Sequence, residues 1–169
     1  MNLKTNCKTK LISEDEAKLK RQQVAETGQV LVWTNGCFDV LHAGHVDFLS
    51  KASELGDVLI VGLNSDHSVS SLKGNGRPIF TFEQRATVLA SLAVVDFVIE
   101  QVDNTPSRIL GLLQPDISCK GADYRPPRGK PIPEASVIEQ YGGQLIFIDL
   151  MDGLSSSSII DRLKLIGLD

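Results

Sequence analysis

Short apolar runs alternate with helical patterns along most of this 169-residue chain, and this alternation limits the fold more than any other feature. Five runs rich in Val, Ile and Leu have the length of buried strands, at residues 30–33, 57–64, 94–100, 115–120 and 144–150. Helical patterns follow them, at residues 43–55, 82–92, 105–113, 133–141 and 156–166. The alternation predicts an α/β fold with a doubly wound, five-stranded parallel sheet. Such sheets bind ligands beyond the carboxyl ends of their strands, where the strand order reverses.

The first 28 residues predict a polar helix that packs on the flank of the domain. Ser13 and Glu16 have the spacing of a capping box, and Gly28 ends the pattern. We therefore expect an N-terminal helical extension at residues 1–28 and a single domain at residues 29–169. No run approaches the roughly 18 apolar residues of a membrane span, and the N-terminus has no apolar signal region. These observations favour a soluble, unprocessed protein without membrane contact.

Charge and cysteine content narrow the class of protein. The formal net charge of -4 argues against a general nucleic-acid binder, which normally carries an excess of Lys and Arg. Cys7, Cys37 and Cys119 lie far apart and include no C-x-x-C pair, which fits neither a disulfide framework nor a zinc ribbon. A reducing, cytoplasmic setting is the simpler interpretation. Because the net charge is negative, any binding of phosphate must depend on a few cationic or donor groups gathered at one site.

The stretch TNGCFDVLHAGHVDFL, residues 34–49, carries the strongest local signal. It leaves the first strand through a turn at Asn35 and Gly36, and His42 and His45 fall on one face of the first turn of the next helix. A helix N-terminus is an anion site, to which two imidazoles add donors. A zinc site is weaker, because catalytic zinc usually takes three protein ligands and His67 is the only other histidine. From residues 34–49 alone, the alternative remains that His42 and His45 only cap the helix or pack in the core.

With its neighbours, this stretch resembles the nucleotidyltransferase superfamily that is marked by an H-x-G-H motif, here residues 42–45 preceded by GCFD. The resemblance covers nearly the whole chain and includes LGDVLIVGLNSD, LKGNGRPIFTFEQR, KGADY and DGLSSSSII. Within the superfamily the chain looks most like the adenylyltransferases that make ADP-heptose from ATP and D-glycero-β-D-manno-heptose 1-phosphate, in a stand-alone form without the sugar kinase of many relatives. The resemblance implies a Rossmann-like nucleotidyltransferase fold, ATP and a sugar 1-phosphate as partners, and Mg²⁺ bound with ATP rather than by a protein cage.

The resemblance also implies roles for individual residues. The expected catalytic residues, which hold phosphates and stabilise charge, are His42, His45, Arg85 and Lys120. The residues expected to bind the nucleotide are Thr34, Asn35, Gly36, Cys37, Phe38, Asp39, Asn64, Asp66, Gly121, Asp123, Gly153, Ser155, Ser156 and Ser157. Those expected to bind the acceptor are Lys73, Arg77 and Tyr124. Asp39 and the serines have an alternative as plain helix caps, and Asn64 and Asp66 as structural turn residues.

Two departures bear on the substrates. Cytidylyltransferases that make CDP-glycerol carry R-T-E-G where this chain has LMDG at residues 150–153, so their arginine is missing, and many relatives have a basic residue at the position of Ser53. A cytidylyltransferase acting on glycerol 3-phosphate is therefore the rival within the class, and an ATP-binding module without turnover is the rival outside it. No G-x-G-x-x-G follows the first strand, which disfavours a dinucleotide-dependent oxidoreductase. The oligomeric state is left open, with a homodimer as one option.

Overall fold

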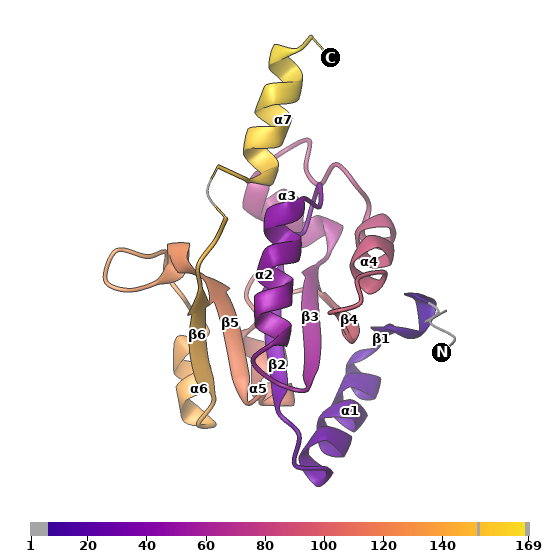
Figure 1. Cartoon of the computed structure of the whole chain (residues 1–169), viewed down its shortest axis with the longest axis vertical. Helices are drawn as coiled ribbons and strands as arrows, with labels where there is room; N and C mark the ends of the chain where they lie inside the picture. The colour runs from indigo at the N-terminus through magenta and orange to yellow at the C-terminus, as the bar shows by residue number, and fades with distance from the viewer. Residues whose placement is uncertain (1–6, 152, 168–169) are drawn as a thin grey trace.

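A parallel sheet forms the centre of the computed structural model, which describes residues 7–151 and 153–167 (Figure 1). Within these residues the sheet has six strands in the order β1-β4-β3-β2-β5-β6, and every neighbouring pair is parallel. The strands are β1 (Leu11–Ile12), β2 (Leu31–Gly36), β3 (Val58–Asn64), β4 (Phe97–Gln101), β5 (Ile117–Gly121) and β6 (Gln144–Ile148). The order reverses at β2, because β3 and β4 continue on one side of it and β5 and β6 on the other.

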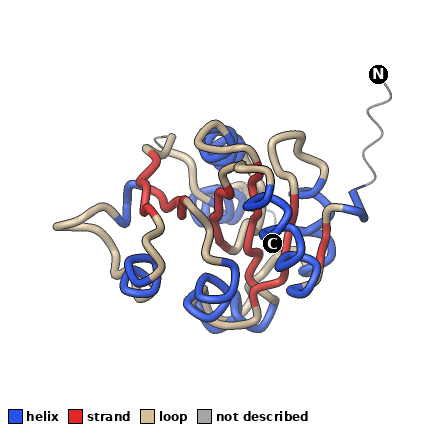
Figure 2. Tube along the Cα trace, turned by 90° about the horizontal axis from the view of Figure 1, so that it is seen from below, coloured by secondary structure: helices blue, strands red, loops and turns tan. Residues whose placement is uncertain are grey.

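Helices cover both faces of this sheet (Figure 2). The α-helices are α1 (Glu14–Glu26), α2 (Ala43–Ser53), α3 (Asp66–Lys73), α4 (Phe82–Ala90), α5 (Ser107–Leu113), α6 (Ala135–Gln140) and α7 (Ser156–Leu165). Two short 3₁₀ helices, η1 (Cys7–Thr9) and η2 (Ala122–Tyr124), complete the described elements. The helix α7 extends away from the body of the protein (Figure 1), and it has no buried residue.

Side chains that alternate along the strands build two hydrophobic cores. Val32 faces a core that contains residues of α2 and α4, whereas its neighbours Leu31 and Trp33 face a core shared with α1, α5 and α6. A continuous apolar run in the sequence thus reflects a strand that is buried on both faces. The close packing has a local requirement at Gly62, where an added Cβ would lie 2.4 Å from the Trp33 ring.

The doubly wound α/β expectation is confirmed, with two differences. The sheet has a sixth strand, β1, which pairs with β4 through Leu11↔Val98 and Ile12↔Ile99. Two residues are too short to show a period, so the sequence did not reveal this strand. The helix α3 is the second difference, because Asn64 and Asp66 are expected from the sequence to bind the nucleotide, with structural turn residues as the alternative, and no helix is predicted at this position. Ser65 caps α3 by accepting a hydrogen bond from the Ser68 N–H.

The helices start and stop within a few residues of the predicted ranges. The pattern at 82–92 becomes α4, which ends at Ala90, and the pattern at 133–141 becomes the shorter α6. Ser13 and Glu16 form the predicted capping box of α1. No helix in the described ranges is long and apolar enough to cross a bilayer.

Candidate active site

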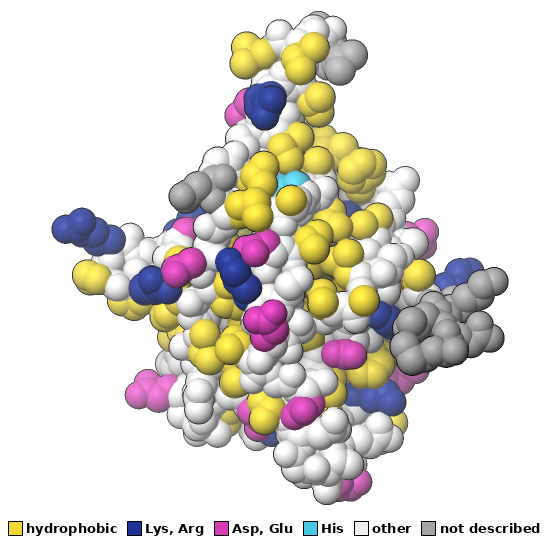
Figure 3. All heavy atoms as spheres, viewed as in Figure 1, with side chains coloured by type: hydrophobic (Ala, Val, Ile, Leu, Met, Phe, Trp, Pro, Cys, Tyr) yellow, Lys and Arg dark blue, Asp and Glu magenta, His cyan; other side chains and the backbone are white. Residues whose placement is uncertain are grey.

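A cavity of about 640 Å³ opens at the carboxyl ends of the strands, at the point where the strand order reverses. Its wall is formed by the turn that follows β2, the start of α2, the loop after α3, the segment from β5 to α6, and the start of α7. This is the position at which doubly wound sheets bind ligands. Leu150, Met151 and Leu154 line the cavity and are exposed, and Figure 3 shows apolar side chains gathered at the foot of α7.

The turn after β2 has an unusual backbone. Phe38 and Val40 have φ angles of 44° and 53°, in the left-handed region that non-glycine residues rarely adopt. Such strain persists only where the surrounding structure fixes it. Here Thr34 donates its hydroxyl proton to the Cys119 carbonyl, and the Arg85 guanidinium donates to the Cys37 carbonyl. The turn is therefore tied to β5 on one side and to α4 on the other.

The two histidines stack against each other at the start of α2. Their ring centroids lie 3.8 Å apart with an interplanar angle of 26°. The His42 backbone N–H donates to His45 Nδ1 at 3.4 Å, so the neutral His45 ring carries its proton on Nε2 and keeps one donor. Both ring nitrogens of His42 are buried and have no hydrogen-bond partner among the described residues. Unpaired buried polar atoms are costly, so they indicate a missing ligand group.

Burial also determines the charge of these rings. Burial and the neighbouring His42 lower the pKa of His45 to about 4, and burial lowers the pKa of His42. Both rings are therefore mainly neutral near pH 7 in the free protein. Neutral imidazoles can still donate one hydrogen bond each, and an anion placed between them would favour protonation. The pair thus suits a ligand that brings negative charge.

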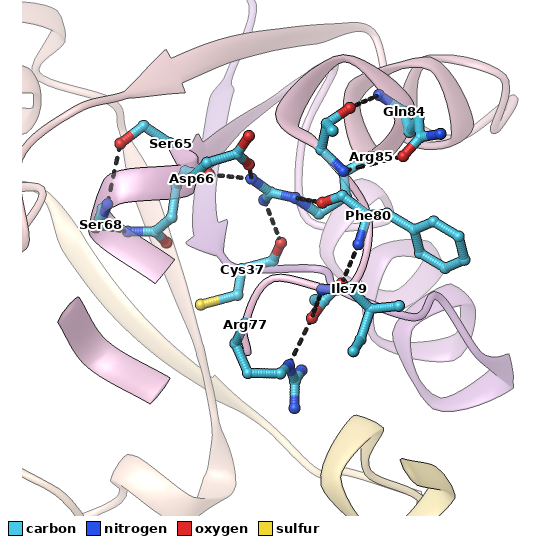
Figure 4. A network of polar contacts seen from close by, with 12 residues as sticks. Cys37, Ser65, Asp66, Ser68, Arg77, Ile79, Phe80, Gln84 and Arg85 are labelled. Carbon is cyan, nitrogen blue, oxygen red and sulfur yellow. Dashed lines mark hydrogen bonds and ion pairs between the residues drawn. The ribbon is translucent and has the colours of Figure 1, made fainter. Parts of the chain in front are cut away.

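Arg85 lies behind the strained turn rather than in the cavity wall (Figure 4). Its side chain is 2% exposed, and it donates to the carbonyls of Phe80, Cys37 and Asn64 and to the Asp66 carboxylate, at distances of 2.6–3.0 Å. One guanidinium thus joins the turn, the end of β3 and the start of α4. Asp66 does not line the cavity either.

Asp39 lines the cavity, but its carboxylate is fully engaged. It is 1% exposed, pairs with Arg77 Nε at 2.7 Å and accepts the backbone N–H groups of Ile79 and Phe80. Burial opposes its ionisation, but these bonds outweigh that effect and lower the pKa of the carboxyl group. Asp39 therefore holds the loop after α3, which presents Arg77 to the cavity.

A second cluster of charges comes from β5 and the segment that follows it. Lys120 Nζ donates to Asn35 Oδ1 at 2.8 Å and forms an ion pair with Glu134, which is 2% exposed. The ammonium groups of Lys120 and Lys130 lie 5.5 Å and 5.2 Å from the centre of the Tyr124 ring. Lys130 also pairs with Asp123. Lysines thus dominate this wall, and each has a polar partner.

The start of α7 adds hydroxyl and backbone donors. Ser155 caps the helix by accepting the Ser158 N–H, and the Ser156 hydroxyl donates to the Asp39 carbonyl, which ties α7 to the turn after β2. Ser155, Ser156 and Ser157 line the cavity. Gly153, with a φ of 73°, shapes the chain before them but does not line it.

The structure gathers most of the predicted residues in one place. Those that line the cavity are Thr34, Asn35, Gly36, Cys37, Phe38, Asp39, His42, His45, Asn64, Lys73, Arg77, Lys120, Gly121, Asp123, Tyr124, Ser155, Ser156 and Ser157. Arg85, Asp66 and Gly153 do not. Sequence reasoning missed Glu134 and the segment of Asn104, Thr105 and Pro106, which carry no motif of their own. The described residues contain no group of three His, Cys, Asp or Glu side chains with metal-ligand geometry.

A doubly wound domain with a histidine-bearing helix start at the switch point is a nucleotide-binding enzyme fold, and the donors in the cavity fit a triphosphate. The chain belongs to the cytidylyltransferase-like family, which matches residues 33–162, and it is a nucleotidyltransferase. It is 46% identical over 80% of its length to the bifunctional protein HldE of Syntrophotalea carbinolica. It is also 42% identical over 89% and 95% of its length to the bifunctional proteins HldE of Hahella chejuensis and Campylobacter fetus.

The chain spans about a third of the length of these relatives, with 27%, 31% and 33% of them covered. Among solved structures, the chain resembles a lipopolysaccharide core biosynthesis protein from Thermoplasma volcanium, with a TM-score of 0.57, 29% identity, and coverage of 73% of this chain and 98% of that one. A pantoate-beta-alanine ligase from Francisella tularensis, solved with an ATP analogue and beta-alanine, has a TM-score of 0.56 at 14% identity and covers 93% of this chain and 77% of its own. The second likeness supports the fold alone.

Proposed function

We propose that the protein transfers AMP from ATP to D-glycero-β-D-manno-heptose 1-phosphate, which gives ADP-heptose and pyrophosphate. The observation that carries the reaction class is the stacked pair His42 and His45 at the start of α2, with both ring nitrogens of His42 unpaired inside the cavity. The choice of acceptor is supported by the relatives named HldE and by the KGADY and DGLSSSS stretches of this sequence.

The reaction needs one displacement at phosphorus. An oxygen of the sugar 1-phosphate attacks the α-phosphorus of ATP, the bond from that phosphorus to the bridging oxygen breaks, and pyrophosphate leaves with the electron pair. Two anions must approach each other, so catalysis is mainly positioning and charge neutralisation. The cavity can position and neutralise these anions with cationic groups and neutral donors. The cationic groups are Lys73, Arg77, Lys120 and Lys130.

His42 and His45 would donate hydrogen bonds to the phosphate oxygens on which charge develops. Ser155, Ser156 and Ser157, with the free N–H groups at the start of α7, would hold the triphosphate from the other side of the turn. Gly36 brings the backbone close to the ligand, and an added Cβ there would lie 3.1 Å from the Phe38 ring. Arg77 reaches the same cavity from the loop that Asp39 anchors, and Lys73 reaches it from the end of α3.

Mg²⁺ would enter with the triphosphate. When bound, it neutralises charge on the phosphate oxygens and orients the leaving pyrophosphate. The donor set of the cavity fits this role: Asp39 is occupied by Arg77 and two backbone N–H groups, so phosphate oxygens and water would supply most ligands, as is usual for Mg²⁺. Small-molecule substrates are therefore the partners that the site accounts for.

A pyrophosphate-release assay tests the substrate pair. ATP competes with CTP, and heptose 1-phosphate competes with glycerol 3-phosphate, with kcat/KM as the measure of specificity. ATP with heptose 1-phosphate should be the best pair. A better result with CTP and glycerol 3-phosphate would contradict the substrate assignment while leaving the reaction class in place. ATP binding without pyrophosphate release for any acceptor would favour a binding module instead.

A further inference from the structure

Glu134 is a charged residue of the cavity wall to which the proposed chemistry gives no task. It immediately precedes α6, lines the cavity, and is 2% exposed. Among the described residues its carboxylate pairs with one group, the ammonium of Lys120. An ion pair in such a position is only weak evidence of a stabilising role, because desolvation can exceed the attraction between the two charges. Glu134 therefore calls for an explanation that involves a ligand.

The other carboxylates of the cavity wall differ from Glu134 in their surroundings. Asp39 is held by Arg77 and by two backbone N–H groups, and Asp123 is paired with Lys130. Lys120 donates a hydrogen bond to Asn35 and forms the ion pair with Glu134, whose buried Oε1 has no hydrogen-bond partner among the described residues. Glu134 and Lys120 thus present an acceptor and a donor to the cavity directly beside each other.

A carboxylate is out of place in a cavity that binds two phosphorylated substrates, since it repels both of them. Lys120 offsets part of this repulsion, and a ligand group that donates a hydrogen bond to the carboxylate offsets more of it. Phosphate groups offer no donor in their ionised form, whereas hydroxyl groups do. The part of the ligand that meets Glu134 must therefore be a hydroxylated region.

The contact between Glu134 and Lys120 also limits the spacing of the ligand groups they bind. A phosphate on Lys120 and a hydroxyl on Glu134 must be carried by positions that lie close together on the ligand. A sugar 1-phosphate meets this condition, because its 2-hydroxyl is on the carbon next to the one that carries the phosphate. In ATP, the carbons that carry the ribose hydroxyls, C3′ and C2′, lie two and three bonds from C5′, the carbon that carries the phosphates.

We propose that Glu134 is a specificity-determining residue that accepts a hydrogen bond from the 2-hydroxyl of the acceptor sugar, while Lys120 contacts the adjacent phosphate. This inference rests on the proposed function, because it assumes that the acceptor is a sugar 1-phosphate. Under this proposal, Glu134 makes the enzyme prefer acceptors that carry a hydroxyl group next to the phosphate-bearing carbon. A buried acceptor of this kind discriminates against ligands that lack the matching donor, because the acceptor is then left unpaired.

The test measures steady-state kinetics of the full chain and of Glu134→Gln with heptose 1-phosphate and with its 2-deoxy analogue. For heptose 1-phosphate, the variant should lose about tenfold or more in kcat/KM, mainly through the KM of the acceptor, because a charge-assisted hydrogen bond is replaced by a weaker one. The KM for ATP should stay unchanged. For the 2-deoxy analogue, wild type and variant should differ by less than about twofold. Glu139→Gln is the matched control, because Glu139 is an exposed residue of α6, the helix that Glu134 precedes.

Several results would overturn the inference. An equal loss with both acceptors would mean that Glu134 acts only by placing Lys120. A higher KM for ATP with an unchanged acceptor KM would assign the carboxylate to the nucleotide. Unchanged kinetics would remove any role in the site.

Two further measurements keep the inference testable. Glu134→Asp retains the charge but moves it by one methylene, so it should fold and lose discrimination between the two acceptors even if Glu134→Gln does not fold. If wild type shows no turnover with heptose 1-phosphate, the proposed function fails. In that case the dissociation constants of heptose 1-phosphate and of its 2-deoxy analogue, measured for wild type and variants, test the contact between Glu134 and the 2-hydroxyl on their own.

Discussion

Replacing Arg85 by methionine should unfold the turn after β2 rather than merely weaken a phosphate contact. The guanidinium of Arg85 donates to three backbone carbonyls and to the Asp66 carboxylate. Methionine retains much of the apolar length of the side chain but supplies none of these donors. Each buried polar group that loses its partner costs roughly 1–3 kcal/mol. After partial relaxation we expect a loss of about 3–5 kcal/mol in the free energy of unfolding, a large part of the 5–15 kcal/mol of a typical domain.

Urea unfolding followed by tryptophan fluorescence measures this loss. Trp33 is the single tryptophan and is 1% exposed, so its emission reports the loss of the core. Arg85→Lys should fall between wild type and Arg85→Met, because an ammonium keeps the charge but its three donors cannot match a planar fork. Arg108→Met is the control: this side chain is 51% exposed and pairs with Glu14 and Asp103, so its loss should cost less than about 1 kcal/mol.

The reasoning would be refuted by a stable Arg85→Met protein with weakened ATP binding. A change below about 1 kcal/mol in the free energy of unfolding, combined with a higher KM for ATP, would show that Arg85 leaves the turn and contacts phosphate. That outcome would support the role in phosphate binding that the sequence resemblance implies.

Three further predictions concern the histidines and the loop after β5. His42→Ala and His45→Ala should each lower kcat by a factor of about 10² in pyrophosphate release while leaving the thermal midpoint nearly unchanged, and near-normal turnover in both would contradict their role. The pKa of His45 is about 4 in the folded protein against 6.5 for an unperturbed histidine, so below about pH 6.5 the unfolded chain binds a proton that the folded chain does not. Stability should therefore fall between about pH 6.5 and pH 4 by up to about 3 kcal/mol from this residue, and His45→Gln should show a shallower fall in urea unfolding across that range. Residues 120–130, which carry Gly, Pro and several charges, should exchange amide hydrogens more slowly when ATP and sugar phosphate are bound, and equal exchange with and without ligands would count against a lid.

The features that could be predicted are those that depend on residues close together in the sequence. Ser13 and Glu16, or Ser155 and Ser158, lie three residues apart, so their capping interactions follow from local spacing. The same holds for His42 and His45. The apolar runs likewise predicted a sheet that is covered on both faces.

The features that could not be predicted depend on contacts between residues far apart in the sequence. Arg85 reaches Cys37 and Asn64 across 48 and 21 residues, and no local pattern separates such a buried arginine from one that points into a cavity. Glu134 follows Pro133 at the start of a helical pattern and looks like an ordinary surface residue until Lys120 is placed beside it. The strand β1 exists only because β4 offers a free edge.

The weak attachment of α7 has a consequence for how affinity is measured. No side chain of this helix is buried, although its first residues complete the cavity wall and Ser156 bonds to the Asp39 carbonyl. We expect a segment with so little buried surface to open at small cost in free energy, so that the complete cavity would be populated for only part of the time. The apparent dissociation constant of ATP then equals the intrinsic constant divided by the docked fraction of α7. Substitutions on the outer face of α7, far from any phosphate, would change nucleotide affinity by shifting that fraction alone.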